Sequence, residues 1–298
     1  MISTQTTTSQ NLSVGQYLKV ISELLKTRLS FLVAFSSAFG FMLAESGYIN
    51  WEILVAVSLG GFFVSGGATT INQILEVPFD AVMSRTQNRP LPSGKVNMTE
   101  AWVVAVASAL FGLSLLAIYT NWLTVILSAI SLVLYSFVYT PLKRVGPIAV
   151  FVGAIPGALP PLLGWVAATG TIGTEALILF GIQFFWQFPH FWAIAWVADD
   201  DYKKAGFKLL PMGGKKDFKT AVQIMSYTLF LLPLGLLPTK LGLTGINSAI
   251  VATLCGAIFL FQTFQLIGDC SRKSALRLMF GSFIYLPVVQ IAYLLDKI

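Results

Sequence analysis

Long, continuous apolar stretches are the feature that most constrains how this chain can fold. Several of them approach the roughly 20 residues that cross the hydrocarbon core of a bilayer as an α-helix. Of the 298 residues, 56% are hydrophobic and only 11% are charged, whereas about 25% of the residues in a soluble domain are charged. Because the apolar runs are continuous rather than alternating, a transmembrane β-barrel is disfavoured. The sequence therefore predicts an all-α polytopic membrane protein.

Nine transmembrane helices account for these stretches. The predicted spans are residues 24–44, 52–75, 101–119, 122–140, 147–168, 175–197, 220–239, 246–267 and 276–295. Prolines inside the fifth and seventh spans are expected to kink or locally unwind them; these are Pro156, Pro160, Pro161, Pro233 and Pro238. We expect a single domain over residues 1–298. Its first 18 residues carry no charge and lack the basic region of a signal peptide, so they predict a disordered cytoplasmic tail.

Basic residues divide unequally between the two sets of loops. Seventeen of the 19 lysines and arginines lie before or at the start of the first span, or in and at the edges of the loops after the second, fourth, sixth and eighth spans; only Lys240 and Lys297 lie on the other side. Cytoplasmic loops carry an excess of Lys and Arg. We therefore expect a cytoplasmic N-terminus and an outer C-terminus. With no long presequence before the first span, the expected location is a bacterial inner membrane.

An amide and two carboxylates stand at the cytoplasmic end of the second predicted span. Asn72, Glu76 and Asp80 are four residues apart, and each such step turns an α-helix only about 40° beyond a full turn, so they share a face. Carboxylates that face a bundle interior are costly unless a positive group lies among them. Mg²⁺ takes oxygen ligands of this kind, commonly one or two carboxylates together with substrate phosphates. A helix-end cap with interface charges is the simpler alternative.

Basic side chains and a second acidic helix end lie on the same side of the membrane. The basic residues of the loops after the second and fourth spans include Arg85, Arg89, Lys143 and Arg144. The sixth span ends in three aspartates, Asp199, Asp200 and Asp201. Arginine and lysine can bind phosphate oxygens, although they also mark topology, and the aspartates could belong to a solvated loop. Together these groups predict a metal–diphosphate site at the cytoplasmic surface.

His190 is the only histidine in the chain. It lies eleven residues before Asp201, which places both on one helix face about 16 Å apart along the axis. A histidine within a span could ligate iron, hydrogen-bond a carboxylate or shuttle a proton, and a structural role is the alternative. The aromatic residues around it would suit a large flat ligand, but equally core packing or lipid contact; they are Phe184, Phe185, Trp186, Phe188, Phe191, Trp192 and Trp196.

Five segments follow one another in the order "NQILEVPFDAVMSRTQNRPLPSG", "YTPLKR", "GAIPGALPPLLGWVAATG", "WQFPHFW" and "DYKKAGFKLLPM". Together they resemble the UbiA superfamily of intramembrane prenyltransferases, and within it the heme-farnesylating branch. The resemblance runs from the first span to the loop after the sixth, and the later spans are similar mainly in hydropathy. It implies a nine-helix UbiA-type bundle that transfers the farnesyl group of farnesyl diphosphate to a vinyl group of heme b. Addition of water and release of diphosphate complete the implied reaction.

The resemblance also implies roles for single residues. Asn72, Glu76 and Asp80 would bind Mg²⁺ and through it the diphosphate, and Asp201 would be the acid of a second metal-binding motif. We expect Glu76, Asp80 and Asp201 to be catalytic. The side chains expected to hold diphosphate oxygens are Arg85, Arg89, Lys143 and Arg144. His190 would face the heme as an axial ligand or hydrogen-bond partner.

The second motif departs from the superfamily pattern, which is usually Asp-x-x-x-Asp. Val197 stands four residues before Asp201, so either Asp199 or Asp200 supplies the second carboxylate or that carboxylate is absent. Glu76 also stands where many members have Asp, and its longer side chain can still reach a metal. The number of Mg²⁺ ions is therefore left open.

Three other functions compete with this interpretation. A UbiA-type enzyme could prenylate an aromatic or quinone-precursor acceptor instead of heme. A membrane transporter could use the acids as an ion path, although they cluster at helix ends. A heme-insertion factor without catalysis is the third alternative. The expected partners are the bilayer, heme b and farnesyl diphosphate, with heme A synthase or a terminal oxidase as recipient of the product; no nucleic acid is expected.

Overall fold

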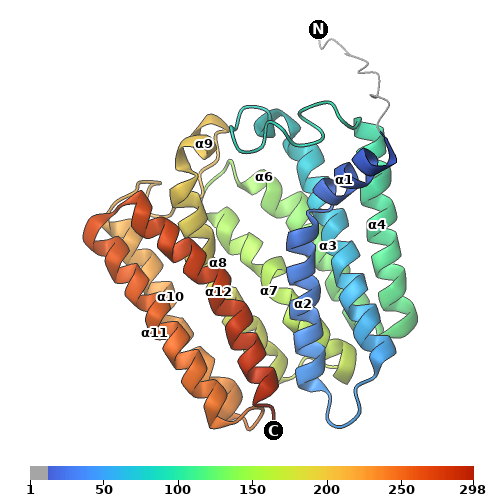
Figure 1. Ribbon diagram of the computed structural model, residues 1–298, viewed down its shortest axis with the longest axis vertical. Coiled ribbons are helices and arrows are strands. Elements are labelled where there is room, and N and C mark those ends of the chain that lie inside the picture. Colours follow the sequence, from blue (N-terminus) through green and yellow to red (C-terminus); the bar gives the residue numbers. More distant parts are fainter. Residues whose placement is uncertain (1–12) are drawn as a thin grey trace.

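The computed structural model describes residues 13–298, which form a bundle of long helices (Figure 1). Within these residues nine helices are long and apolar enough to cross a membrane, which confirms the predicted all-α membrane fold. Seven are α2 (Thr27–Ala44), α3 (Trp51–Asp80), α4 (Met98–Tyr119), α7 (Ile148–Thr169), α8 (Thr174–Val197), α10 (Phe218–Lys240) and α11 (Ile246–Asp269). The others are α12 (Arg272–Leu295) and a continuous unit of α5 (Trp122–Val133), η1 (Leu134–Tyr139) and α6 (Thr140–Leu142). Two short helices lie outside the spans, α1 (Val14–Leu24) and α9 (Asp199–Lys204).

The start of the chain differs from the prediction. Residues 1–12 of the expected tail lie outside the described residues, but α1 begins at Val14, so disorder is the wrong prediction for residues 14–18. Ser13 and Gln16 form a capping box, in which each side chain bonds the other's backbone N–H. Such a cap satisfies N–H groups that the first helical turn leaves free. Lys26 then takes a left-handed backbone conformation (φ 44°), which separates α1 from α2 and moves the start of the first span from 24 to 27.

The prolines do not unwind their helices. Helix α7 is continuous through its three prolines and α10 through its two, so the predicted local unwinding is wrong there. Helix α3 likewise continues through Pro78 to Asp80, beyond its predicted end at residue 75. The irregular segment is η1, a π-helix that immediately precedes Thr140 and Pro141. Pro141 has no backbone N–H to continue the α-helical pattern, and π-helical turns occur frequently at functional sites.

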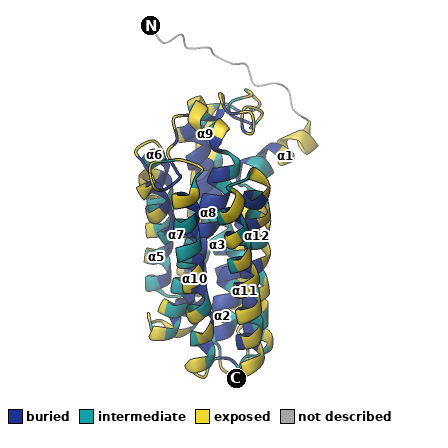
Figure 2. Ribbon diagram, turned by 90° about the vertical axis from the view of Figure 1, so that its left-hand side faces the viewer, coloured by how far each residue is buried: buried dark blue, intermediate teal, exposed yellow. Residues whose placement is uncertain are grey.

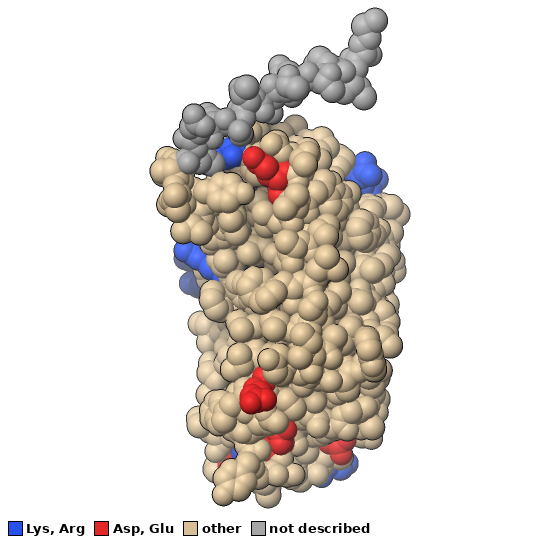
Figure 3. Space-filling view, turned by 90° about the vertical axis from the view of Figure 1, so that its right-hand side faces the viewer, with Lys and Arg blue, Asp and Glu red and all other residues tan. Residues whose placement is uncertain are grey.

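The spans form two groups that meet at the centre of the bundle. Helices α2 to α5 pack with α7 on one side, and α8 packs with α10 and α12 on the other, while α7 contacts α8 and α2 contacts α12 (Figure 1). Buried residues line the inner faces of the helices and exposed ones their outer faces (Figure 2). The outer faces carry many large apolar side chains, as a lipid-facing surface requires. On the face in Figure 3, a broad band without charged side chains separates the charges near the two ends.

Two glycines allow α2 and α7 to pack backbone against backbone. A Cβ atom at Gly40 would collide with the carbonyl of Pro161, and a Cβ atom at Gly164 would collide with the carbonyl of Ser37. Small residues at such crossings let helices approach closely within a membrane. This contact fixes the position of α2, whose first residues follow Lys26 at the end of the bundle that also holds α6 and α9 (Figure 1).

Candidate functional site

The amide and the two carboxylates of α3 are buried inside the bundle. Asn72 is 1% exposed, Glu76 4% and Asp80 0%. Each side chain contacts a cation from a different segment: Lys26 from the α1–α2 junction, Lys143 after α6, and Arg89 in the loop after α3. The structure therefore brings the three α3 residues together with two of the four predicted basic residues and with one lysine that the sequence analysis counted only as a topology marker.

The two ion pairs are short. Arg89 Nη1 lies 2.6 Å from Asp80 Oδ2, and Lys143 Nζ lies 2.8 Å from Glu76 Oε1 and 3.1 Å from Oε2. Burial lowers the pKa of Lys143 and is the largest single influence, but the charge and hydrogen bond of Glu76, together with Tyr135 and Tyr202, outweigh it, so the pKa is raised overall. Asp80 Oδ1 is buried and has no hydrogen-bond partner within the described residues. A buried carboxylate oxygen without a partner is costly, so this atom is available to a ligand.

Asn72 is held between two helical segments. Lys26 Nζ donates to its Oδ1 at 3.3 Å, and its Nδ2 donates to Thr140 Oγ1 at 3.0 Å. Thr140 in turn donates to the Tyr135 carbonyl at 2.9 Å, five residues earlier, a bond that the π-helical turn makes possible. The left-handed turn at Lys26 and the π-helix therefore orient the amide from both sides.

Aromatic rings surround the cations of the site. Lys143 Nζ lies 4.7 Å from the centre of the Tyr139 ring and 5.7 Å from that of Phe207. The Arg144 guanidinium lies 4.7 Å from the centre of the Phe79 ring. Cation–π contacts of this length are attractive. Neighbouring Lys143 and Arg144 thus differ in position, because only Lys143 pairs with a carboxylate of α3.

Asp201 joins the two acidic helix ends. Its carboxylate accepts hydrogen bonds from the backbone N–H groups of Ser84 (3.2 Å) and Arg85 (3.1 Å) and from Lys204 Nζ (3.0 Å). The bond from Lys204 is the main cause that lowers the pKa of Asp201 to about 2; desolvation opposes it and the backbone N–H groups add to it. The Arg85 guanidinium lies 5.8 Å from the centre of the Tyr202 ring. Asp201 thereby holds the loop after α3 against α9.

The other two aspartates after α8, Asp199 and Asp200, differ in burial and in their ion pairs. Asp199 is buried and pairs with Lys203 at 2.7 Å and Lys216 at 3.3 Å. The Asp200 side chain is 89% exposed, and its nearest cation is Lys216 at 3.6 Å. Within the described residues no group of three or more His, Cys, Asp or Glu side chains is arranged to hold a metal ion. The oxygen atoms that α3 offers to a cation at this end therefore include the amide of Asn72 as well as the carboxylates of Glu76 and Asp80.

His190 packs between α8 and α12. Its Nδ1 lies 2.8 Å from Ser282 Oγ, and its ring stacks on Trp186 with centres 4.4 Å apart and planes 20° apart. Phe191 contacts the imidazole edge and also lies 6.4 Å from the Tyr139 ring, which contacts Lys143. This aromatic series connects the histidine with the acidic end of the bundle.

The remaining aromatic residues of the segment mostly pack with one another. Phe188 and Trp192 pack against Tyr227 of α10, and Phe184 stacks on Phe180 and lies edge-on to Phe151. The sequence analysis left packing and ligand contact open for this group. For Phe184, Phe188 and Trp192 the contacts are with neighbouring rings, whereas Trp186 and Phe191 touch the histidine.

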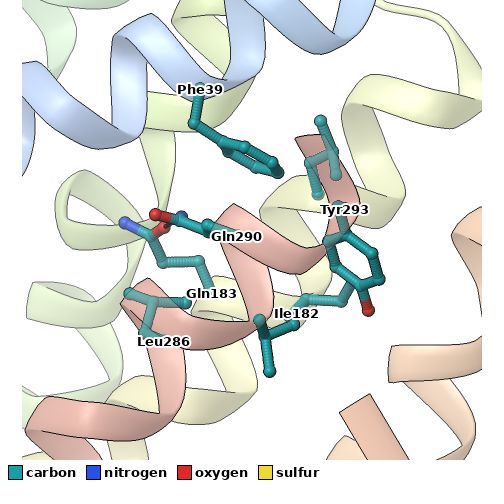
Figure 4. A pocket seen from close by; sticks show the side chains of 8 residues that line it. Phe39, Ile182, Gln183, Leu286, Gln290 and Tyr293 are labelled. Carbon is teal, nitrogen blue, oxygen red and sulfur yellow. Dashed lines mark hydrogen bonds between the residues drawn. The ribbon is translucent and has the colours of Figure 1, made fainter. Parts of the chain in front are cut away.

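A small cavity lies farther from the acidic end, between α2, α8 and α12 (Figure 4). Gln290 Nε2 donates to Gln183 Oε1 at 3.0 Å beside this cavity, and Ser36 donates to Gln290 Oε1 at 3.2 Å. Phe39 and Tyr293 stack across the same helices. These contacts close the bundle between α2 and α12.

The sequence and the fold are both similar to known proteins. The model of the UbiA prenyltransferase family matches residues 33–286. A protein of Cytophaga hutchinsonii named protoheme IX farnesyltransferase is 55% identical over 276 residues, which cover 93% of this chain and 96% of that protein. One of the same name from Flavobacterium psychrophilum is 44% identical over 282 residues, covering 92% of this chain and 93% of the relative.

Two solved structures have the same fold. A digeranylgeranylglyceryl phosphate synthase has a TM-score of 0.78 at 22% identity, covering 94% of this chain and 98% of that one. A UbiA homologue from Archaeoglobus fulgidus, bound to GPP and Mg²⁺, has a TM-score of 0.67 at 17% identity, covering 92% and 99%. The arrangement of the nine spans found in residues 13–298 is therefore shared with these proteins.

Proposed function

The chain belongs to the UbiA prenyltransferase family, and we propose that it transfers the farnesyl group of farnesyl diphosphate to a vinyl group of heme b, releasing diphosphate. The relatives named protoheme IX farnesyltransferase match nearly the whole chain, which supports this choice of donor and acceptor. The structural observation that carries the proposal is the buried pair Glu76 and Asp80, each held by its own cation at the end of an apolar bundle.

The charges of this site suit a diphosphate with a divalent cation. Two buried carboxylates and an amide contact three basic side chains: Arg89 and Lys143 pair with the carboxylates, and Lys26 bonds the amide of Asn72. A divalent ion bound to the carboxylates would leave the cations free for phosphate oxygens. Arginine and lysine are the usual partners of such oxygens in proteins.

The residues present fit Mg²⁺. Asn72, Glu76 and Asp80 offer only oxygen ligands, which Mg²⁺ prefers, and Asp80 Oδ1 has no partner among the described residues. We propose that these three residues hold the ion. When bound, Mg²⁺ would stabilise the negative charge that develops on the diphosphate as the allylic C–O bond breaks.

The basic residues divide into two roles under this proposal. Arg89 and Lys143 lie at the carboxylates and would bind the diphosphate directly once the carboxylates hold metal. Arg85 and Arg144 lie over the rings of Tyr202 and Phe79. We propose that this second pair attracts the anion at the mouth of the site. Asp201 would act by holding the loop that carries Arg85 and Arg89.

The acceptor would lie on the His190 side of the site. A heme has a wide apolar face, and Trp186, His190 and Phe191 of α8 offer a ring cluster that continues through Tyr139 towards the acidic end. The allylic cation formed when diphosphate leaves reacts with any nearby water, so the donor chain must lie in an apolar space. Aromatic faces such as Tyr139 also stabilise a cation. A vinyl carbon of the heme would then form the new C–C bond, and water would complete the product.

The protein is a multi-pass membrane protein, and we propose that the end with the acidic pair faces the cytoplasm. This orientation follows the positive-inside rule, because the loops at that end hold most of the lysines and arginines. Transfer of the product to heme A synthase or a terminal oxidase stays a prediction.

The test is turnover by the purified protein in detergent with heme b, farnesyl diphosphate and Mg²⁺, read from the mass of the heme. We expect a gain of one farnesyl unit plus water that EDTA abolishes. A benzoate-type acceptor runs in parallel. Prenylation of that acceptor alone would refute the heme assignment and keep the diphosphate site. Absence of both products with folded protein would refute the enzymatic proposal.

A further inference from the structure

Ser282 of α12 contacts two residues of α8, His190 and Trp186, through two of its atoms. Its hydroxyl lies 2.8 Å from His190 Nδ1, and its carbonyl accepts a hydrogen bond from Trp186 Nε1 at 3.0 Å. We propose that Ser282 is a positioning residue that fixes the tautomer and orientation of His190, so that Nε2 is free to ligate the iron of the heme substrate. This inference rests on the proposed function, because it concerns how the acceptor is held.

The proton positions follow from the bonds of Ser282. A serine hydroxyl has one proton to donate, and Ser282 Oγ donates it to the Met279 carbonyl at 2.5 Å. With its proton directed to the Met279 carbonyl, the hydroxyl accepts from Nδ1–H of His190, which is the tautomer that the proposed role requires. In a neutral imidazole the other nitrogen then has a free lone pair. The contact consequently selects the tautomer in which Nε2 can bind a metal.

The surroundings of the imidazole ring favour the same tautomer, with the proton on Nδ1. Trp186 stacks on the imidazole at 4.4 Å, and Phe191 and Phe283 meet it edge-on at 5.4 and 5.2 Å. Within the described residues no side chain or carbonyl bonds Nε2, while Nδ1 has its partner. Histidines that ligate metals usually donate their other ring N–H to an oxygen, which sets ring orientation and ligand basicity. Ser282 occupies that position here.

Trp186 makes the orientation rigid. Its indole both stacks on His190 and bonds the Ser282 backbone, so the three residues form one unit across α8 and α12. Ser282 is 0% exposed, and water therefore has little access to replace its hydroxyl. Removal of that hydroxyl would leave Nδ1–H without a partner and the tautomer unselected.

The experiment measures the absorption spectrum and affinity of ferric heme b on the full-length protein in detergent. The variants are His190→Ala, Ser282→Ala, Ser282→Thr and Trp186→Phe. Ser226→Ala is the matched control, because the Ser226 hydroxyl bonds the Val222 carbonyl of its own helix and no other group of residues 13–298. Loss of such a supporting partner typically weakens metal binding about 10- to 100-fold.

We expect Ser282→Ala to lower the heme affinity and to change the spectrum towards that of His190→Ala, while Ser282→Thr, which keeps the hydroxyl, restores both. Trp186→Phe should keep the spectrum with a smaller loss of affinity, because it retains a stacking ring. If Ser282→Ala matches Ser226→Ala while His190→Ala changes the spectrum, the role of Ser282 is refuted and the heme site stands. If His190→Ala leaves the spectrum unchanged, His190 is not the ligand and both the inference and that part of the proposed function are refuted.

Discussion

The carboxylate of Asp201 accepts a hydrogen bond from the backbone N–H of Arg85 at 3.1 Å, although 116 positions separate them in the chain. This bond and the one from Ser84 fix the loop after α3 against α9. The same loop carries Arg89, which pairs with Asp80. Asp201 therefore acts on Asp80 through the backbone of this loop. For that reason Asp201 and its neighbour Asp200 are expected to differ in their effects on activity.

Asp201→Asn should reduce farnesyl transfer far more than Asp200→Asn. An amide at position 201 loses the ion pair with Lys204 and one of its acceptor oxygens, so the loop that holds Arg89 shifts. Displacement of a catalytic group by about 1 Å can cost up to roughly 100-fold in rate. The measurement is kcat/KM for farnesyl diphosphate. An equal loss in Asp200→Asn, whose side chain is 89% exposed, would instead indicate that Asp200 binds metal or substrate.

Lys143→Met should destabilise the protein, whereas Arg144→Met should not. Without Lys143, Glu76 remains a buried charge without a partner, which costs about 3–5 kcal/mol. Arg144 contacts the Phe79 ring instead of a carboxylate. Thermal unfolding in detergent gives the comparison.

The double variant Lys143→Met, Glu76→Gln separates stability from catalysis. Removal of both charges should restore much of the melting temperature, because neutral groups replace the unpaired ion. Activity should stay low, because the residues proposed to bind diphosphate and metal are both lost. A double variant that recovers activity along with stability would show that the pair is structural only.

Gly40→Ala and Gly164→Ala should lower stability by about 1–3 kcal/mol each through overpacking. In both cases the new methyl group would meet a backbone carbonyl of the facing helix, which a side-chain rotation cannot relieve. Gly181→Ala is the control, since a Cβ atom there meets nothing within 4 Å. Melting temperatures should fall for the first two variants and stay level or rise for the control. Unchanged melting temperatures in all three would contradict the close packing of α2 on α7.

The sequence predicted those features that depend on local pattern. Apolar runs of bilayer length predicted the spans, and the four-residue spacing predicted a common face for Asn72, Glu76 and Asp80, whose side chains are all buried in the bundle. Lys26 was missed as a site residue because its approach to Asn72 depends on a left-handed turn between α1 and α2.

Contacts between helices that are far apart in the sequence could not be predicted from the local sequence pattern. The bond of Ser282 to His190 joins residues 92 positions apart, and nothing around Ser282 in the sequence distinguishes it from other serines of apolar helices. The π-helix before Pro141 was likewise unforeseen, although the proline itself marks the place where the α-helical hydrogen bonding must change. Both features depend on which helix packs against which, and therefore on the tertiary fold.

Mg²⁺ and diphosphate should bind cooperatively to this site. In their absence Arg89 and Lys143 are neutralised by Asp80 and Glu76, so diphosphate alone meets cations that are already paired. Metal bound by the carboxylates would free those cations, and by reciprocity diphosphate would strengthen the binding of the metal. Coupling between sites is typically about 1–3 kcal/mol, or roughly 5- to 150-fold in affinity.

Calorimetric titration of inorganic diphosphate with and without Mg²⁺ measures this coupling. The double variant Glu76→Gln, Asp80→Asn should bind diphosphate alone more tightly than the original protein does, because Arg89 and Lys143 are no longer neutralised, and Mg²⁺ should add little. Mg²⁺ also associates with diphosphate in solution. This contribution is the same for the original protein and the double variant, so it cancels when their titrations are compared. Arg144→Met should retain the coupling, since Arg144 has no carboxylate partner in α3. Equal affinities for metal-free diphosphate in the original protein and the double variant would mean that the carboxylates do not control the cations.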